Sequence, residues 1–281
     1  MPRQSSTGEW VNLWRPYGFA DLELLHATYV QQTFPRHAHD GFAVGVIETG
    51  ALGFYYRGQN VVAPPGTINL ANPGEIHTGQ AEGDHGWTYR MFYMPADTLQ
   101  AAADKMSPRP TDFPFFEKGV IEDRRLARKI HTLHTDLESG HLTSLESEAR
   151  FLDMLTSLIA RHADAPPAAH GPVRAALEIQ RTQDYLSACY AEDISLDGLA
   201  DIACLSPFHF AREFKKETGL PPHTYLIQLR VKKAREMIAA GKSIAMAAIE
   251  SGFTDQSHLN RHFKRITGIT PGQYSKIVQD P

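Results

Sequence analysis

The sequence predicts an α+β protein of more than one domain: a small β-barrel first, then a helical segment, then an all-α domain. Three observations lead to this fold class. Strand-like alternation fills residues 20–95, helical periodicity takes over from residue 115, and a stretch in the last third of the chain repeats itself. With 281 residues, 42% of them hydrophobic and 21% charged, the chain is long enough for two globular domains of ordinary composition.

The barrel is predicted from short strands that turns separate closely. Residues 42–47 and 87–94 alternate in the way that a strand with two different faces requires. Turn-forming residues lie between these runs: Gly50, Gly53, Arg57-Gly58, Pro64-Pro65-Gly66 and Asn72-Pro73-Gly74. Such spacing is typical of a small barrel or jelly roll, and we assign residues 1–114 to it.

Residues 115–162 are predicted to form a helical segment. Two stripes have helical spacing and are separated by Ser139-Gly140: Ile121, Leu126, Ile130, Leu133 and Leu137 in the first, and Leu145, Ala149, Leu152, Leu155 and Ile159 in the second. A helical pair of this kind either packs on the barrel or forms a symmetric dimer interface, and the residues favour neither. Residues 163–172, rich in Ala, Pro and Gly, have no apolar period and are predicted to be a linker.

The chain shows no sign of a membrane segment or a secretory signal. No apolar run approaches the ~20 residues that span a bilayer, and residues 1–10 lack the basic-then-apolar order of a signal peptide. We therefore expect a cytoplasmic protein. Its two cysteines, Cys189 and Cys204, fit neither a metal site nor a disulfide framework and are expected to be buried small side chains.

The last third of the chain contains an internal repeat. Residues 199–226, moved forward by 49 positions, match residues 248–275 without a gap at eight identical pairs: His209/His258, Arg212/Arg261, Phe214/Phe263, Lys215/Lys264, Thr218/Thr267, Gly219/Gly268, Pro222/Pro271 and Tyr225/Tyr274. Each copy is predicted to be a helix, a tight turn and a second helix, at about 196–218 and 244–267 within a domain of residues 173–281.

Caps and stripes define these helices. The first helices have the apolar stripes Leu196, Leu199, Ile202, Ala203 and Ile244, Ala248, Ile249. Ser206 and Asp255 are expected to cap the second helices, and Gly219 and Gly268 to end them. Additional helices are expected at 173–190 and 225–240, because a short helix pair cannot bury a core alone.

The outward faces of the second helices are suited to the major groove of DNA. They carry Ser206, Phe208, Ala211, Arg212, Lys215 and Lys216 in copy one, and Gln256, Ser257, Asn260, Arg261 and Lys264 in copy two. Arg can pair with guanine, Gln or Asn with adenine, and Lys with phosphates. The alternative is a pair of merely solvated faces, but the repetition of Arg and Lys at the same positions favours DNA.

The charge distribution agrees with this interpretation. The net charge of −4 is unusual for a DNA-binding protein, but residues 173–281 contain 14 Lys and Arg against 12 Asp and Glu, and residues 1–172 contain 14 against 20. Only the last third is basic, and only weakly, so we expect moderate, salt-dependent affinity for DNA.

The motif G-F-x-D-Q-S-H-L-x-R-x-F-K-x-x-x-G-x-T-P-x-x-Y, at residues 252–274, resembles the signature of AraC/XylS-type bacterial transcription regulators. The resemblance covers about residues 173–278. It implies a seven-helix domain in which a long helix, here about 224–240, joins two helix-turn-helix units that enter successive major grooves. It also implies base contacts by Phe208, Ala211, Arg212, Gln256, Ser257, Asn260 and Arg261, and core positions for Phe214 and Phe263.

Three histidines stand out in the barrel region. His37 and His39 flank one residue, so both point to the same face of a strand, and His77 follows a Pro-Gly turn. H-x-H and P-G-x-x-H resemble the two halves of the cupin fingerprint, and a cupin-like sensor is the usual N-terminal partner in the regulator family. Many cupins bind a metal with these histidines and a glutamate, but Ala43 or Val44 stands at the expected glutamate position.

The role of the three histidines is therefore left open. Three neutral imidazoles can hold zinc, nickel or iron, or His37, His39 and His77 can hydrogen-bond strand ends or bind an anionic effector directly. A metal is possible but no cofactor is required. Tyr89 and Arg90, together with Arg36 and Arg57, are further candidates for holding the carboxylate of an effector.

The resemblance implies an α+β multidomain chain with an N-terminal cupin-like β-barrel, a helical dimerisation segment and a C-terminal all-α double helix-turn-helix domain. It implies a sequence-specific, DNA-binding transcription regulator, not an enzyme, that acts as a homodimer, contacts double-stranded DNA and RNA polymerase, and responds to a small-molecule effector in the barrel. Activation and repression both remain open. The alternatives are a metal-dependent cupin enzyme with a DNA-binding tail, and a ligand-independent DNA-binding protein whose barrel serves only for assembly.

Overall fold

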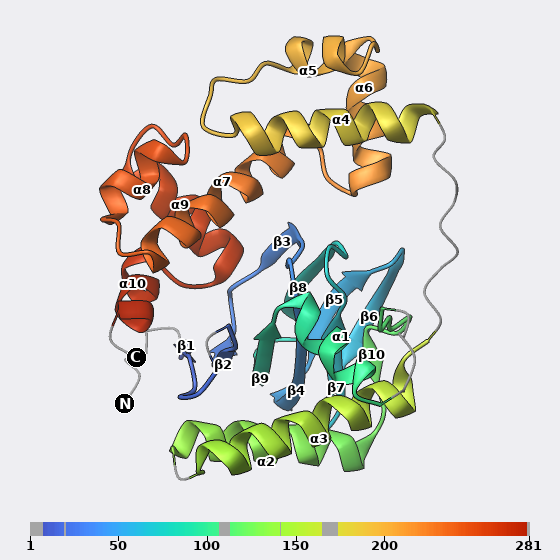
Figure 1. Cartoon of the computed structure of the whole chain (residues 1–281), viewed down its shortest axis with the longest axis vertical. Helices are drawn as coiled ribbons and strands as arrows, with labels where there is room; N and C mark the ends of the chain where they lie inside the picture. Colours follow the sequence, from blue (N-terminus) through green and yellow to red (C-terminus); the bar gives the residue numbers. More distant parts are fainter. Residues whose placement is uncertain (1–7, 20, 107–112, 141, 165–173, 280–281) are drawn as a thin grey trace. The chain divides into compact units, whose positions relative to one another are not determined.

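The computed structural model describes residues 8–19, 21–106, 113–140, 142–164 and 174–279. The chain divides into two compact units, Met1–Pro167 and Ala168–Asp280 (Figure 1). The boundary between them falls inside the predicted linker 163–172, most of which lies outside the described residues. The first unit is rich in β-strands and the second is helical, which confirms the predicted fold class.

The first unit contains two antiparallel sheets. The larger has the order β1-β2-β9-β4-β7-β10 and the smaller β3-β8-β5-β6. Their strands are β1 (Trp10–Trp14), β2 (Glu23–Tyr29), β3 (Phe34–His37), β4 (Phe42–Gly50), β5 (Leu52–Tyr56), β6 (Gln59–Ala63), β7 (Ile68–Ala71), β8 (His77–Ala81), β9 (Trp87–Met94) and β10 (Val120–Ile121). Strand β1 lies before the alternating run at residues 20–95, within the predicted 1–114, whereas β10 lies beyond residue 114.

The central strands of the larger sheet have two differently covered faces. Val44 on β4 is the register partner of Phe92 on β9, and both belong to a buried apolar cluster with Leu70 of β7. Side chains of the opposite parity, such as Tyr89 on β9, point to the other face, because successive side chains of a strand alternate. This parity decides which side chains face the barrel interior.

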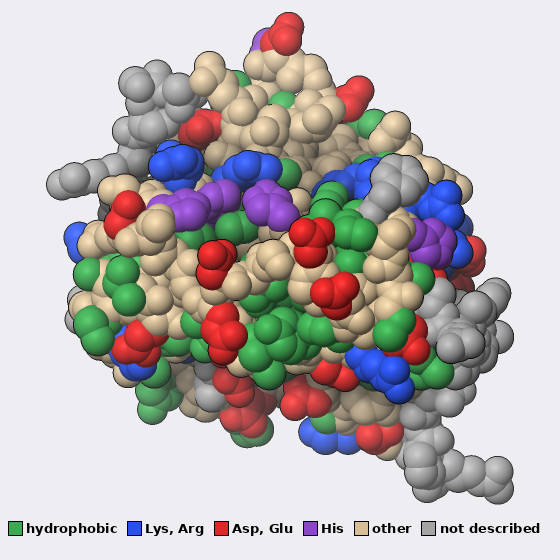
Figure 2. Space-filling view, turned by 90° about the horizontal axis from the view of Figure 1, so that it is seen from above, with side chains coloured by type: hydrophobic (Ala, Val, Ile, Leu, Met, Phe, Trp, Pro, Cys, Tyr) green, Lys and Arg blue, Asp and Glu red, His purple; other side chains and the backbone are tan. Residues whose placement is uncertain are grey.

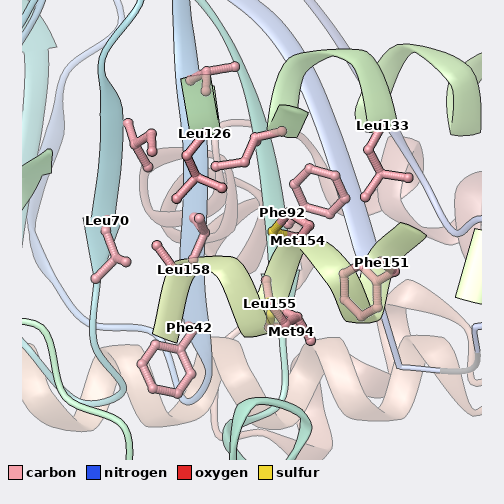
Figure 3. Close-up of a cluster of buried hydrophobic side chains, with 14 of the residues drawn as sticks. Phe42, Leu70, Phe92, Met94, Leu126, Leu133, Phe151, Met154, Leu155 and Leu158 are labelled. Carbon is pink, nitrogen blue, oxygen red and sulfur yellow. The ribbon is translucent and has the colours of Figure 1, made fainter. Parts of the chain in front are cut away.

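Three helices contribute to the cluster outside the larger sheet (Figure 1). They are α1 (Ala96–Asp104), α2 (Arg124–Ser139) and α3 (Ser144–His162). Asp123 caps α2, Gly140 ends it in a left-handed conformation, and Thr143 and Glu146 form a capping box at the start of α3. Figure 3 shows side chains of α2 and α3 packed with Phe42, Leu70, Phe92 and Met94 from the strands. The helical pair therefore packs on the barrel.

The two predicted stripes of this segment differ in outcome. The first stripe, Ile121 to Leu137, is buried throughout. In the second, Leu155 is buried and Leu152 and Ile159 pack partly buried against the cluster, but Leu145 is 77% exposed and α3 also buries Phe151, Met154 and Leu158. The ring of Phe151 stacks with that of Phe92 on β9, so the larger side chains of α3 face the sheet.

The described residues of the second unit form seven helices. They are α4 (Arg174–Cys189), α5 (Leu196–Ile202), α6 (Pro207–Thr218), α7 (Pro222–Ala239), α8 (Ile244–Glu250), α9 (Gln256–Thr267) and α10 (Pro271–Gln279). Helices α5 and α6 form one helix-turn-helix unit, α8 and α9 form the second, and α7 is the long helix between them. The core around the first helix-turn-helix unit contains Leu199, Phe210 and Phe214.

The ungapped alignment of the repeat is wrong in the first helices. Helix α9 follows α6 at a distance of 49 residues, but α8 follows α5 at 48. The left-handed residue of the turn is Cys204 in copy one and Gly252 in copy two, so the second turn is one residue longer before its cap. As a result Ala247 and Ala248 are buried, whereas Ile249, expected in the core, is 59% exposed.

The cysteines also differ from the expectation. Cys204, which lies in the left-handed turn, is exposed, and Cys189 is half-buried. Within the described parts of the chain, none of the helices combines the length and the apolar character that crossing a bilayer requires.

Candidate functional site

Helices α6 and α9 are held in the same way. The side chain of Ser206 accepts a hydrogen bond from the His209 N–H, and that of Asp255 accepts one from the His258 N–H. Gly219 and Gly268 end the helices in left-handed conformations. Phe214 and Phe263 are fully buried, so their aromatic rings fix one face of each helix to the core and leave the opposite face outward.

The side chains predicted to contact DNA lie on that outward face wherever they are described. Arg212, Lys215 and Lys216 on α6 are exposed, and so are Ser206, Gln256, Ser257, Arg261 and Lys264, while Ala211 and Asn260 are half-buried. The side chain of Phe208 lies outside the described residues. Ser206 caps α6 with its hydroxyl oxygen as acceptor, so its O–H group can still donate to DNA.

Helices α6 and α9 differ in charge because of one carboxylate, which the sequence analysis missed. Glu213 lies on α6 and forms ion pairs with Arg212, at 3.4 Å, and with Lys216, at 3.5 Å. The equivalent residue of α9 is His262, whose pKa is lowered by burial and by the neighbouring cationic side chains. Acidic side chains are also interspersed among basic and histidine side chains on the face of the molecule seen in Figure 2. The alignment of the two copies already pairs Glu213 with His262, and comparing charges at aligned positions is the signal that could have found this difference.

The structure brings the three histidines of the barrel together. His37 ends β3 and His77 begins β8, where the two are cross-strand partners, and His39 follows β3. One ligand nitrogen from each of the three lies within 4.8 Å of the others. The ring centroids of His37 and His77 are 4.3 Å apart, and that of His39 is 5.0 Å from each.

Backbone carbonyls orient two of these rings. His37 Nδ1 lies 2.7 Å from the Pro35 carbonyl oxygen, and His77 Nδ1 lies 2.9 Å from that of Glu75. A carbonyl oxygen only accepts, so Nδ1 carries the proton in both rings. Burial lowers the pKa of His37 and lowers that of His77 to about 3. Burial and the two neighbouring histidines hold the pKa of His39 well below its usual range, so the cluster is neutral at physiological pH.

Buried aromatic side chains continue from this cluster into the barrel. The ring of Tyr93 lies 5.1 Å from that of His39, and the Tyr89 hydroxyl shares a hydrogen bond with the Tyr93 hydroxyl. Burial raises the pKa of Tyr93 to about 12, which keeps this phenol protonated. The hydroxyl of Tyr29 and the indole N–H of Trp87 are buried and have no hydrogen-bond partner among the described residues. Strand parity with Tyr89 is the signal that could have identified Tyr93.

Arg90 is not part of this site. It lies on the opposite face of β9 from Tyr89 and binds Glu48 at 2.6 Å and Glu138 of α2 at 2.5 Å. The expectation that both residues hold one effector is wrong, because adjacent residues of a strand cannot share a face. Arg36 stacks over the Tyr55 ring, and Arg57 pairs with Glu75 and stacks over Phe115, so neither is placed with the histidines.

An ionic network around Arg90 joins the sheet to helix α2 and was also missed. Glu48 accepts hydrogen bonds from His26, His131 and Arg90, at distances of 2.6 to 2.9 Å. Although burial raises the pKa of the Glu48 carboxyl, the hydrogen bonds from His26 and Arg90 hold it well below its usual range. This network keeps Glu48, an acid near the histidines in sequence, on the helix side of the sheet.

Both units match known protein families and proteins. Residues 19–155 match the AraC-like ligand binding domain, and residues 199–277 match a helix-turn-helix domain. The HTH-type transcriptional regulator YbfI of Bacillus subtilis is 30% identical over 82% of each chain. The HTH-type transcriptional activator RhaS of an Enterobacter species is 25% identical, over 86% of this chain and 87% of the relative.

A solved structure supports the fold. ToxT from Vibrio cholerae, determined with bound (E)-4-(8-methylnaphthalen-1-yl)but-3-enoic acid, has a TM-score of 0.54 and 10% identity, over 96% of this chain and 99% of that chain. At this identity the likeness is one of fold. The matched domains and the full-length relatives carry the assignment: the chain belongs to the AraC family of helix-turn-helix transcriptional regulators, with an AraC-like ligand-binding domain ahead of its DNA-binding domain.

Proposed function

We propose that α6 and α9 read the sequence of double-stranded DNA, and that a small molecule bound in the barrel controls this binding. The observation that carries the DNA half is the repetition itself. Two helices, each with a side-chain N-cap, a buried phenylalanine and an Arg and a Lys exposed at matching positions, present two polar faces of the same kind. The major groove admits one helix of this kind, and each face can meet base edges and phosphates at once.

In this proposal Arg212 and Arg261 pair with guanine, and Gln256 and Asn260 with adenine. Lys215, Lys216 and Lys264 contact phosphates. Ser257 adds a hydroxyl that can pair with either kind of base edge. Ala211 cannot hydrogen-bond a base, so α6 reads fewer positions than α9.

The effector is proposed to bind where the histidine cluster meets the buried aromatic side chains. Small-molecule sites combine an apolar lining with a few polar anchors. His37, His39, His77, Tyr89 and Tyr93 provide this combination in the barrel. Effector binding changes DNA affinity only if the effector favours one arrangement of the protein over another.

Assembly is proposed to be homodimeric, through the outer face of α3. Leu145 and Ala149 are exposed there, and Leu152 and Ile159 are half-buried at its edge. A two-fold axis would place this apolar strip against its own copy. Light scattering of the full chain is expected to give a dimer, and Leu145→Asp is expected to give a monomer. A wild-type monomer at all concentrations would overturn this part.

The proposal includes a cytoplasmic location and a role in transcription without catalysis. Among the described residues, no carboxylate joins the histidines as a general acid or base would. Contact with RNA polymerase and activation are proposed on the likeness to relatives named as transcriptional activators. Transcription of the selected operator with purified polymerase tests this, and an unchanged transcript yield would refute it.

Selection from a random duplex library tests the DNA half. The full chain is expected to enrich a motif with two elements about one helical turn, ~10 base pairs, apart. Arg261→Ala is expected to lose one specified base, whereas Lys276→Ala, a matched change of an exposed cation on α10, is expected to keep the motif. If no motif is enriched, α6 and α9 do not read sequence.

A further inference from the structure

We propose that His37, His39 and His77 hold a divalent metal ion, zinc above all, and that the remaining coordination position receives the carboxylate of the effector. This inference rests on the proposed function, because it names the chemistry by which the barrel recognises its effector. It assigns an organic anion with an apolar body as the ligand class.

The geometry of the nitrogens suits a single ion. Zn–N bonds of about 2.0–2.1 Å place ligand nitrogens at most about 4 Å apart. The three nitrogens already lie within 4.8 Å of one another, so the imidazoles need to move by about 1 Å or less. The ligands come from β3, from the residues after it and from β8, so the ion would join the two strands.

Two of the rings make their hydrogen bonds to backbone carbonyls through Nδ1. The Nδ1–H groups of His37 and His77 donate to the carbonyls of Pro35 and Glu75. Each neutral ring therefore has its lone pair on Nε2, which can bind a metal, and the carbonyl that accepts from Nδ1–H fixes the orientation of the ring.

These lone pairs also argue against direct binding of an anion. Nε2 of His37 and of His77 accepts rather than donates, and two acceptors repel an oxygen anion. A cation between the imidazoles and the anion removes this conflict. A metal ion that binds the Nε2 lone pairs and an anion that binds the metal are therefore both compatible with the Nδ1–H tautomers of His37 and His77.

A divalent ion bound to the three histidines would need an anionic ligand to balance its charge. Three neutral imidazoles leave a divalent ion with its full charge, and the cluster contains no carboxylate among the described residues. Glu48 binds His26, Arg90 and His131 on the helix side, and Glu75 pairs with Arg57. A buried, uncompensated double charge is costly, so an incoming carboxylate is strongly favoured.

The rest of the interior matches such a ligand. The Tyr29 hydroxyl and the Trp87 indole N–H, at 2% and 1% residue exposure, are donors that lack an acceptor among the described residues. Tyr29 also packs against Phe34, whose ring lies 6.0 Å from that of His37, which links these donors to the cluster. Donors suit the second oxygen of a carboxylate, and the aromatic rings suit an apolar body.

Metal analysis of the full, untagged chain tests the metal half. Chelated protein is reloaded with Zn²⁺, dialysed and measured by elemental analysis. One ion per chain is expected for the wild type and for His85→Ala, a matched histidine on the exposed surface, and loss of the ion for His77→Ala and His39→Gln. An empty wild type, or an ion that His77→Ala and His39→Gln retain, would overturn the inference.

Cobalt substitution tests the open position. Four-coordinate Co²⁺ absorbs strongly in the visible range, and benzoate is expected to change this spectrum whereas benzyl alcohol, its neutral counterpart, is not. A spectrum that ignores benzoate would overturn the anion half. DNA binding of the same samples separates the two proposals. If the reloaded wild type takes up no metal but still selects its DNA motif, the metal site alone is refuted. If it holds the metal but selects no motif, the proposed function is refuted.

Discussion

The two helix-turn-helix units share a buried phenylalanine at the same position but differ at their surfaces. Phe214 and Phe263 are both fully buried 49 residues apart, and both second helices have an N-cap and a terminal glycine. On the outside, α6 carries Glu213 and Glu217 among its cations, whereas α9 carries no acidic residue. Packing allows few alternatives at the buried positions, but the exposed face can diverge freely. We therefore expect α9 to contribute more to DNA affinity than α6.

The turns differ as well. Cys204 adopts a left-handed conformation with φ of 52°, which a residue with a side chain adopts only at a cost, whereas Gly252 adopts it with φ of 86° without that cost. The longer second turn places Gly252 against Ala191 and Arg230. One unit thus has a strained, open turn, and the other a relaxed, crowded turn.

The largest expected effect tests the equivalence of the cores. Phe214→Ala and Phe263→Ala should each destabilise the second unit by about 3–5 kcal/mol, because each removes a fully buried ring. Denaturant unfolding followed by circular dichroism measures this. Met246→Ala, at an exposed position of α8, is the control and should cost far less. Costs that differ greatly between the two phenylalanines would show that the cores are not equivalent.

The next effect tests the turns. A Cβ on Gly252 would lie 2.9 Å from Ala191 Cα and 2.9 Å from Arg230 Nε, in a backbone region that disfavours side chains. Gly252→Ala should therefore cost roughly 1–3 kcal/mol of unfolding free energy.

Cys204→Gly is the matched change in the other turn and should stabilise the unit slightly, because it relieves the left-handed strain. Equal destabilisation by both substitutions would contradict the distinction between the turns.

The smallest effect tests the surfaces. Glu213→Gln should strengthen DNA binding roughly two- to tenfold, since it removes a negative charge beside Arg212 and Lys216 and frees both cations for DNA. Fluorescence anisotropy at fixed salt measures the affinity. The gain should shrink as salt rises. Weaker binding by Glu213→Gln would mean that the carboxylate positions Arg212 for its contact.

The architecture could be predicted from the sequence because it depends on local signals. The caps Ser206 and Asp255 and the terminal glycines Gly219 and Gly268 placed the ends of α6 and α9. The stripe of α2 was equally clear, because its buried residues recur with one period. In α3, however, Phe151 and Met154 compete with a second apolar stripe, and only the shape of the sheet decides between the two.

The candidate effector site was predictable in part. The spacing of His37, His39 and His77 indicated a cluster, and the structure brings them together. The pairing of Tyr89 with Arg90 ignored strand parity, which the sequence already contained. The network of Glu48 with His131 joins residues far apart in the chain, and its partners depend on how helix α2 docks, which no local pattern specifies.

The most direct test of the account is the affinity of wild type, Arg261→Ala and Arg212→Ala for the selected operator and all of its single-base variants, at one salt concentration. We expect Arg261→Ala to lose about 1–3 kcal/mol of binding free energy and to become indifferent to one base pair. Arg212→Ala should lose less, at a different base pair, because Glu213 already engages its guanidinium. If Arg261→Ala bound every variant as the wild type does, α9 would not read DNA and the account would be wrong.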